Sequence, residues 1–352
     1  MYAPKISVLI PMYNRKHYIA DCIDSVLAQS FQDFEIVVRD DGSVDGSAEF
    51  VKQRYASEIS SGKIKVKHNP KNLGEITTTI RLFLDACGKY FAVLHSDDMY
   101  LPDALKYLYT TAEKYSADVV HSIRFIKSPP GGVINSEMKF QLMSPEKLTV
   151  DEVTVMPDDQ ISRFKEFFYS SLYFGDIQYT FFRRDFILDN KVLIETRCNP
   201  LFWLLLAKVY VKTPEIYYVY RDAPDSKTRN NATSNQSLYS MKNFEESLER
   251  LIERGSLFDK YAAKIELFKK YPELLYVAKA RDFNIMTLNS IKSRNYYSNG
   301  NIPPEVRQTV EKIFTKYFGI NAAYPIFLFH LVNLLPYYPN FETVFLPHQK
   351  NQ

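Results

Sequence analysis

The chain has 352 residues, of which 46% are hydrophobic and 24% charged, so it is long enough to bury a core in one large domain and a smaller one. Its 44 basic and 41 acidic residues leave a net charge of only +3, which argues against a nucleic-acid partner because duplex binding needs clustered positive charge. The three cysteines, Cys22, Cys87 and Cys198, are widely spaced and indicate neither a disulfide framework nor a zinc site; they predict buried, reduced thiols.

The N-terminal segment enters a strand pattern at once, without the basic, apolar and cleavage regions of a signal peptide. This predicts a cytoplasmic protein. The most apolar part of the tail, residues 320–335, falls short of the roughly 20 apolar residues that a spanning helix needs. We expect it to touch the inner face of a membrane at most.

Apolar runs of strand length alternate with helix-period segments through the first 125 residues. We predict strands at 5–10, 34–39, 63–68, 90–95 and 118–126, and helices near 16–29, 46–60, 75–86 and 102–115. Such alternation is typical of βαβ units and a mostly parallel sheet, whose ligands lie beyond the carboxyl ends of the strands.

The later part of the chain mixes both patterns. Residues 127–157 predict a loop with a short hairpin, a flap over the site, and a mixed region from 179 to 187 follows. Next come a helix at 200–209, a strand at 215–221 and a polar stretch at 222–237 that predicts a domain boundary. We expect the remainder to be helical, with helices near 238–255, 257–270, 272–290 and 304–318.

Two adjacent acidic residues, Asp97 and Asp98, follow the fourth predicted strand. Neighbouring carboxylates repel one another unless a cation neutralises them, and oxygen ligands suit Mg²⁺ or Mn²⁺ shared with a diphosphate. The alternative is structural: Asp98 would cap the helix that follows, since Asp favours that position.

Polar loops follow the first three strands as well. Tyr13, with Pro11 and Asn14 beside it, is suited to stack on a base, and Arg15 to meet a phosphate. The acidic turn that begins with Asp40 and Asp41 offers acceptors to a ribose or base, although it equally describes a turn and helix cap. The loops of four strands at one sheet edge together supply what a nucleotide sugar requires.

The segments that carry these loops are PKISVLIPMYNRKHYIADCIDSVLAQSFQDFEIVVRDDGSVDGS, NLGE and ACGKYFAVLHSDDMYLPDAL. Together they resemble the N-terminal half of a family 2 glycosyltransferase of GT-A fold, closely over 4–110 and more weakly to 228. The resemblance implies an α/β fold with a mostly parallel sheet flanked by helices, in a GT-A domain at 1–228. Residues 229–352 would then form a C-terminal helical subdomain for contact with an acceptor, a second copy or a membrane surface.

The same resemblance implies roles for individual residues. Pro11, Tyr13, Asp40 and Asp41 would surround the nucleoside, usually uridine, and the Asn-x-Gly after the third strand falls on Asn72 and Gly74. The metal-binding D-x-D falls on His95, Ser96 and Asp97, so Asp97 would hold Mn²⁺ or Mg²⁺ with Asp98 as helper. His95 is a departure from the pattern. Arg221 and Ser226 would close over the diphosphate.

Members of this family invert the anomeric centre, which needs a general base at the acceptor hydroxyl. Cys198 and Asn199 occupy the place of the usual Glu-Asp pair, and Asn199 cannot act as a base. Glu195 and the acidic pair Asp158 and Asp159 are the alternative candidates, and each also fits a solvated charge or a helix cap.

The sequence therefore predicts a glycosyltransferase that moves a sugar from a UDP-linked donor to a hydroxyl of a glycan or lipid-linked acceptor. The departures at His95 and Asn199 keep open a catalytically silent nucleotide-sugar-binding protein of the same fold. A nucleotidyltransferase or a nicotinamide-dependent oxidoreductase is disfavoured, because no glycine-rich phosphate loop follows the first strand.

Overall fold

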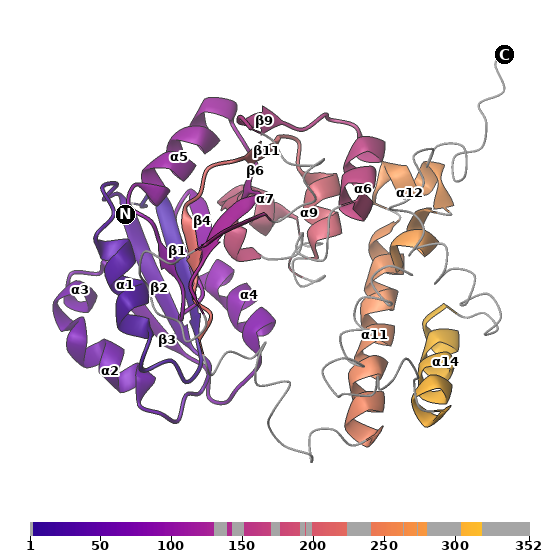
Figure 1. Cartoon of the computed structure of the whole chain (residues 1–352), viewed down its shortest axis with the longest axis horizontal. Coiled ribbons are helices and arrows are strands. Elements are labelled where there is room, and N and C mark those ends of the chain that lie inside the picture. The colour runs from indigo at the N-terminus through magenta and orange to yellow at the C-terminus, as the bar shows by residue number, and fades with distance from the viewer. Residues whose placement is uncertain are drawn as a thin grey trace. The chain divides into compact units, whose positions relative to one another are not determined.

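The computed structural model describes residues 3–129, 139–142, 151–169, 177–190, 194, 199–223, 241–262, 264–272, 274–279 and 304–318 (Figure 1). The chain divides into two compact units, Met1–Pro224 and Asp225–Gln352. This division and the boundary expected at 228/229 both lie in the polar stretch 222–237. The roles expected of the two parts stay predictions.

The first unit is built on a large, mostly parallel sheet. Its strands run in the order β3-β2-β1-β4-β10-β6-β11-β9, where β10 is antiparallel to both neighbours and β9 is antiparallel to β11. The strands are β3 (Ile64–His68), β2 (Phe34–Asp40), β1 (Ile6–Met12), β4 (Tyr90–Val93), β10 (Thr180–Arg183), β6 (Val119–Ser122), β11 (Tyr210–Thr213) and β9 (Thr154–Val155). The expected α/β fold is thus confirmed.

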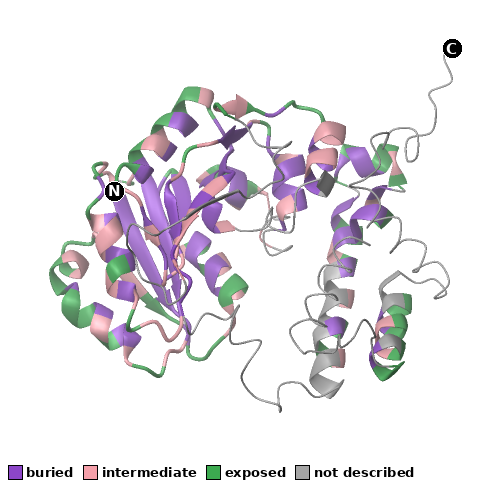
Figure 2. Ribbon diagram, viewed as in Figure 1, coloured by how far each residue is buried: buried purple, intermediate pink, exposed green. Residues whose placement is uncertain are grey.

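Helices cover both faces of this sheet, which explains why its central strands are buried along their whole length and are mostly apolar. In Figure 1, α1 (Ile19–Leu27), α2 (Ser47–Arg54) and α5 (Ala104–Tyr115) lie on one side, and α4 (Glu75–Asp85), α7 (Arg184–Asp189) and α9 (Pro200–Leu206) on the other. Every residue of β1, β2 and β4 is buried (Figure 2). The carboxyl ends of these strands are therefore positioned by a rigid core.

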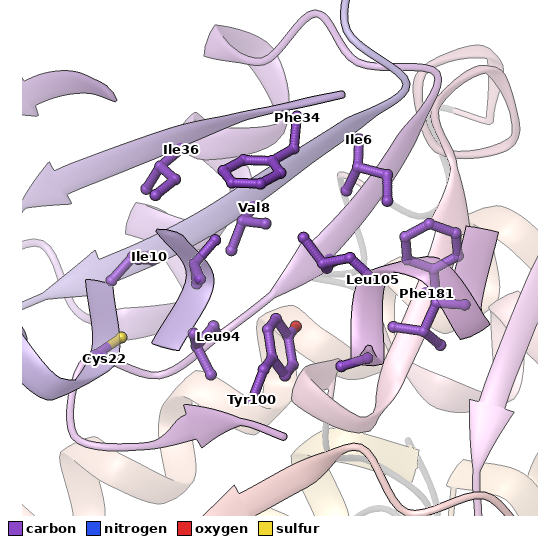
Figure 3. Close-up of a cluster of buried hydrophobic side chains, with 14 of the residues drawn as sticks. Ile6, Val8, Ile10, Cys22, Phe34, Ile36, Leu94, Tyr100, Leu105 and Phe181 are labelled. Atoms are coloured by element: carbon purple, nitrogen blue, oxygen red, sulfur yellow. The ribbon is translucent and has the colours of Figure 1, made fainter. Parts of the chain in front are cut away.

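The core on the α1 face is one continuous apolar cluster (Figure 3). Alternate residues of β1, such as Val8 and Ile10, pack against α1 and α5, to which Cys22 and Leu105 belong. On the opposite face the ring of Phe83 in α4 lies 5.3 Å from that of Phe91, and Trp203 in α9 lies 5.0 Å from Phe182. Packing on both faces fixes the position of β4, and Asp97 and Asp98 follow its carboxyl end.

A second, small sheet diverges from the first. The strand expected at 118–126 is two strands, because the chain leaves the large sheet at Ile123 and enters the small one. Ser122 Oγ lies 2.7 Å from the carbonyl oxygen of Glu215 at this exit. The small sheet has the order β5-β12-β7-β8, with β5 (Met99–Tyr100), β12 (Tyr218–Tyr220), β7 (Arg124–Lys127) and β8 (Lys139–Leu142). β7 and β8 pair antiparallel, so the hairpin expected within 127–157 begins earlier than expected, at Arg124; the flap role stays a prediction.

Several element boundaries differ from expectation. The helix expected at 46–60 is interrupted at Tyr55, whose hydroxyl donates to Asp24 Oδ1 at 2.8 Å, and continues as α3 (Ala56–Ser60). α9 ends at Leu206, so that 210–213 forms strand β11, which the apolar pattern concealed. Cys22 is buried as predicted, but Cys87 is exposed, which corrects that expectation; Cys198 lies outside the described residues.

The second unit is helical in its described part. α11 (Met241–Ala262) is one continuous helix where two were expected, and α12 (Glu266–Lys270) and α14 (Pro304–Phe318) follow. Lys312 and Lys316 of α14 pair with Glu245 and Glu249 of α11. Among the described residues, no helix has the length and apolarity to cross a membrane. The tail 320–335 lies outside them.

Candidate functional site

The loops that follow β1 and β2 are joined by hydrogen bonds between side chains and backbone. Asn14, at φ 52°, donates its backbone N–H to Ser43 Oγ at 2.9 Å, and its side-chain Oδ1 accepts from Val44 N at 2.9 Å. Arg15 N donates to Ser47 Oγ, also at 2.9 Å. Asn tolerates this left-handed conformation better than most residues. The two loops therefore form one wall, and Pro11 lies buried at its base with Tyr13 half-buried beside it.

Asp40 and Asp41 are both buried and both accept hydrogen bonds from the protein. Asp40 Oδ2 lies 2.8 Å from His68 Nδ1. Asp41 Oδ1 accepts from Asn69 Nδ2 at 2.8 Å and from Leu73 N at 2.9 Å. These carboxylates consequently hold the loop that follows β3 against the loop that follows β2, besides any contact they make to a ligand.

Glycines make this close approach feasible. Gly42 has φ 75°, and a Cβ on it would lie 2.9 Å from the carbonyl carbon of Lys71. Gly74, at φ 87°, precedes α4 and donates its N–H to Asp41 Oδ2 at 2.9 Å and to Asn72 Oδ1 at 3.0 Å. Both conformations strain any residue that carries a side chain. Asn72 and Gly74 are thus placed at the same sheet edge as the first two loops.

The acidic turn after β4 completes the edge. Asp97 is partly exposed, and its Oδ2 lies 3.1 Å from Arg15 Nε, so the first and fourth loops meet through an ion pair. Ser96, which lies between His95 and Asp97 in the sequence, is buried. The structure therefore brings Asp97, Arg15, Asp41 and Gly74 to one edge of the sheet, as expected from the parallel topology.

Asp98 is turned into the protein. Its Oδ2 accepts a hydrogen bond from the Tyr218 hydroxyl at 2.6 Å, and its Oδ1 accepts from Arg221 N at 2.7 Å. Burial, together with the neighbouring carboxylate of Asp97, raises the pKa of Asp98. The cap alternative for Asp98 is wrong, because α5 begins only at Ala104 and Asp98 is followed by β5. Asp98 fastens the acidic turn to β12.

His95 stands where the family pattern has an acidic residue, and it is surrounded by acids. Its Nε2 lies 3.1 Å from Glu75 Oε1, and its Nδ1 lies 3.9 Å from Asp98 Oδ2. Burial favours the neutral imidazole, but the carboxylates of Glu75, Asp98 and Asp97 together raise the pKa of His95 to about 9. At neutral pH this side chain is a cation in an acidic turn.

Arg221 reaches the same region from the end of β12. Its Nη2 donates to Asp21 Oδ2 at 2.7 Å, and its guanidinium carbon lies 5.3 Å from the centroid of the Tyr18 ring. Within the described ranges the buried Arg221 Nε has no hydrogen-bond partner. Arg221 thereby lies among α1, β5 and the acidic turn; Ser226 lies outside the described residues.

The candidate bases have different outcomes. Asn199 caps α9, because its Oδ1 accepts from Leu201 N at 3.0 Å. Asp159 Oδ1 accepts from Ser162 N at 2.7 Å, which places it at the start of α6 (Gln160–Tyr169) in the cap role left open for it. Burial opposes ionisation, but the bonds from Ser162 keep the pKa of Asp159 below its ordinary value. Asp158 is exposed beside Arg163, and Glu195 lies outside the described residues.

The described ranges contain no group of three or more His, Cys, Asp or Glu side chains arranged to hold a metal ion. Both oxygens of Asp98 already accept protein donors, so Asp97 is the carboxylate of the pair that remains for a cation. One or two carboxylates are the protein share that Mg²⁺ usually takes when substrate phosphates supply further ligands. The donor set fits such a shared metal and does not by itself make a closed protein site.

Two residues of this edge escaped the sequence analysis. Tyr218 is one of several aromatic residues in the segment 215–221; Tyr217, Tyr218 and Val219 are all buried, so only the packing of β12 shows that Tyr218 reaches the acidic turn. Glu75 is the first residue of α4, where an acid is ordinary. Its proximity to His95 depends on how α4 packs.

Comparison with known proteins agrees with this geometry. The family described as Glycosyl transferase family 2 matches residues 7–187. GlyG of Streptococcus pneumoniae, a glycosyltransferase, is 31% identical over 115 residues, which are 33% of this chain and 37% of GlyG. Chondroitin synthase of Escherichia coli is 32% identical over 148 residues, 42% of this chain and 21% of that protein. The chain thus spans well under half the length of these curated relatives.

Solved structures share the fold. Residues 1–349 of TarS from S. aureus, in complex with UDP-GlcNAc, give a TM-score of 0.60 at 15% identity, covering 96% of this chain and 92% of that one. A second structure of TarS residues 1–349 gives a TM-score of 0.57 at 17% identity, covering 94% of this chain and 88% of that one. The sheet with flanking helices is the GT-A architecture that the sequence predicted.

Proposed function

Since the chain belongs to glycosyl transferase family 2, we propose that it transfers a sugar from a nucleoside-diphosphate donor to a hydroxyl of an acceptor. We propose a UDP-linked donor, an acceptor that is a glycan or is lipid-linked, inversion at the anomeric carbon, and assistance by Mn²⁺ or Mg²⁺. The single observation that carries the proposal is the meeting of the β1 and β4 loops at the Arg15–Asp97 ion pair, on the edge where the β2 and β3 loops also converge.

The donor's nucleoside is assigned to the wall formed by the first three loops. Tyr13 is half-buried, and the Asp41 carboxylate holds the loop that carries Asn72 and Gly74. A base offers a flat face to an aromatic ring, and Asp41, whose oxygens accept protein donors, would keep the wall in shape around it. The complex of TarS with UDP-GlcNAc, on the same fold, supports a uridine donor.

The diphosphate is assigned to the basic and acidic side chains at the carboxyl end of β4. Asp97 would hold the divalent cation, and Arg15 and Arg221 would face the phosphates, with Ser96 in the turn between. When bound, the metal would neutralise negative charge that develops on the departing nucleoside diphosphate. We propose that Asp98 positions Asp97 and does not bind the cation, because both its oxygens accept hydrogen bonds, from the Tyr218 hydroxyl and from Arg221 N.

Transfer with inversion needs a base that takes the proton of the acceptor hydroxyl as it attacks the anomeric carbon. Asp159 is a weak choice, because a capping carboxylate with a lowered pKa is a poor proton acceptor. We therefore propose Glu195, which precedes the cap of α9 by a few residues. Glu195→Gln is expected to abolish transfer while donor binding persists.

A second function is favoured by one observation. Asn199, in the place of the usual base, is committed to capping α9 and cannot accept a proton. This supports the alternative of a catalytically silent protein that binds a nucleotide sugar. The two functions differ in one reaction: only an active enzyme releases the nucleoside diphosphate from the donor.

The experiment screens nucleotide sugars by thermal shift with and without Mn²⁺, and then measures nucleoside diphosphate release for each stabilising donor. Asp97→Asn should lower turnover by at least about 100-fold, because it removes the charge that holds the cation. Asp24→Asn is the matched control, since Asp24 is also paired with an arginine, Arg54, at 2.8 Å, but on the exposed surface.

Three results would contradict this proposal. Stabilisation by no nucleotide sugar rejects the donor site. Stabilisation without product release favours the silent binding protein. Full turnover of Asp97→Asn in the presence of a chelator rejects the metal role.

The acceptor is proposed to be a glycan or a lipid-linked molecule. A lipid-linked acceptor would require access to a membrane surface, and the tail beyond Gly319 is the segment assigned to it, with dimerisation through the helical unit as the alternative. Co-sedimentation with liposomes should be stronger for the full chain than for a chain that ends near Gly319. Equal sedimentation rejects that role for the tail.

A further inference from the structure

Arg15 is held in place by its surroundings before its side chain reaches Asp97. Its backbone N–H donates to Ser47 Oγ at 2.9 Å, and its Nη1 donates to the carbonyl oxygen of Asn14 at 3.2 Å. The residue before it, Asn14, is fixed at φ 52° by bonds to the β2 loop. The guanidinium is therefore presented to the acidic turn by a closed network and not by a freely rotating side chain.

The ion pair itself is sheltered. Arg15 Nε lies 3.1 Å from Asp97 Oδ2, and the two side chains are only 14% and 17% exposed. Exposed ion pairs contribute little because water screens them, whereas a pair at this depth is screened less. Arg15 consequently neutralises Asp97 in the protein as it stands.

The other acids near Asp97 have protein partners of their own. Asp98 accepts hydrogen bonds from the Tyr218 hydroxyl and Arg221 N, and Glu75 lies beside the imidazole of His95. The donors to Asp98 are uncharged, so the positive charge that is paired with Asp97 is that of Arg15. The cation that the acidic pair seemed to demand is, for Asp97, already present as Arg15.

We propose that Arg15 is a built-in counter-ion of Asp97 that competes with the divalent cation for this carboxylate. The inference rests on the proposed function, in which Asp97 is the metal ligand. The guanidinium of Arg15 repels a second cation on the same carboxylate because both are positive, and it occupies a lone pair of Asp97 Oδ2 that a bidentate metal ion would use. Arg15 therefore lowers the affinity of the free protein for a divalent cation.

The test measures Mn²⁺ binding to the full chain without nucleotide, by the electron paramagnetic resonance signal of free Mn²⁺. Arg15→Gln should lower the Kd for Mn²⁺ about fivefold, because it removes the competing positive charge and keeps a neutral polar side chain. Asp97→Asn should lose this Mn²⁺ site altogether. Arg54→Gln is the control, since it removes the same charge from the exposed pair with Asp24 and should leave the Kd unchanged.

The outcomes separate the counter-ion role of Arg15 from the metal role of Asp97. A Kd for Arg15→Gln that is equal to or higher than that of Arg54→Gln, with the site lost in Asp97→Asn, overturns the counter-ion role and leaves the proposed metal ligand intact. Retention of the site in Asp97→Asn overturns both the counter-ion role and the metal role of Asp97. Donor turnover, measured separately, reports on the transferase function in either case.

Discussion

The hydroxyl of Tyr218 is the contact on which the position of the acidic turn depends most. It donates to Asp98 Oδ2 at 2.6 Å and lies 3.3 Å from His95 N, which donates to it, so one oxygen joins both ends of the turn to β12. Both residues are far from Tyr218 in sequence. Tyr218→Phe removes only this oxygen and keeps the ring, which packs against Tyr100 and Tyr179.

The magnitude follows from the burial of Asp98, which is 1% exposed. A buried acceptor that loses its donor bears its desolvation cost, which is about 1–3 kcal/mol. We expect the free energy of unfolding to fall by about 2 kcal/mol. For a unit of this size, with a urea m-value near 3 kcal/mol/M, the unfolding midpoint should fall by about 0.7 M.

Trp203 makes the measurement direct. It is the single tryptophan of the chain, it is fully buried, and it lies in α9 of the first unit. Its fluorescence in a urea titration therefore reports the unfolding of that unit. Tyr109→Phe is the matched control, because the described residues offer the Tyr109 hydroxyl no hydrogen bond. If Tyr218→Phe unfolds at the same urea concentration as Tyr109→Phe, the role assigned to this hydroxyl is wrong.

Three further predictions concern the scaffold around the site. Gly88→Ala should destabilise the first unit by about 3 kcal/mol in the same titration, since its Cβ would lie 2.5 Å from Ser7 N. Arg163→Met should cost a similar amount, about 3 kcal/mol, because the buried guanidinium of Arg163 serves the carbonyl groups at the end of α9; unchanged stability would contradict this. Burial opposes ionisation of Glu35, but bonds from Lys65, Ser7 and Cys87 hold the pKa of Glu35 below its ordinary value. The ionised Glu35 therefore stabilises the fold fully above the ordinary pKa of a glutamate, and this contribution is lost as the pH falls through the lowered pKa of Glu35 in the folded protein. The difference in unfolding free energy between wild type and Glu35→Gln should consequently shrink between about pH 6 and about pH 3.

Local pattern was sufficient for much of the first unit. The mostly apolar runs at β1, β2 and β4, alternating with helix-period segments, predicted strands of a parallel sheet, and the polar segment after each predicted loops at one sheet edge. Both predictions rest on near-neighbour rules: side-chain periodicity and the common direction of parallel strands. The family resemblance added the identity of the loops.

Patterns misled where a strand's limits depend on its partners. The run 118–126 has one composition but belongs to two sheets, because Ser122 meets the carbonyl oxygen of Glu215 and the chain turns there. The segment 210–213 is a strand because it pairs with β6 and β9. Neither partner is near in sequence, so no local window contains the information.

The candidate site, like the fold, was determined in part by local sequence and in part by tertiary structure. Sequence alone determined that Asp97, Asp98, Arg15 and the β2 turn gather at one edge, because parallel strands end together. Only the tertiary structure decided how these charges are shared, since Asp98 faces inward to Tyr218 and Arg15 covers Asp97. The reason is physical: a carboxylate's role depends on which donors lie within about 3 Å of its oxygens, and here these donors come from residues up to 123 positions away.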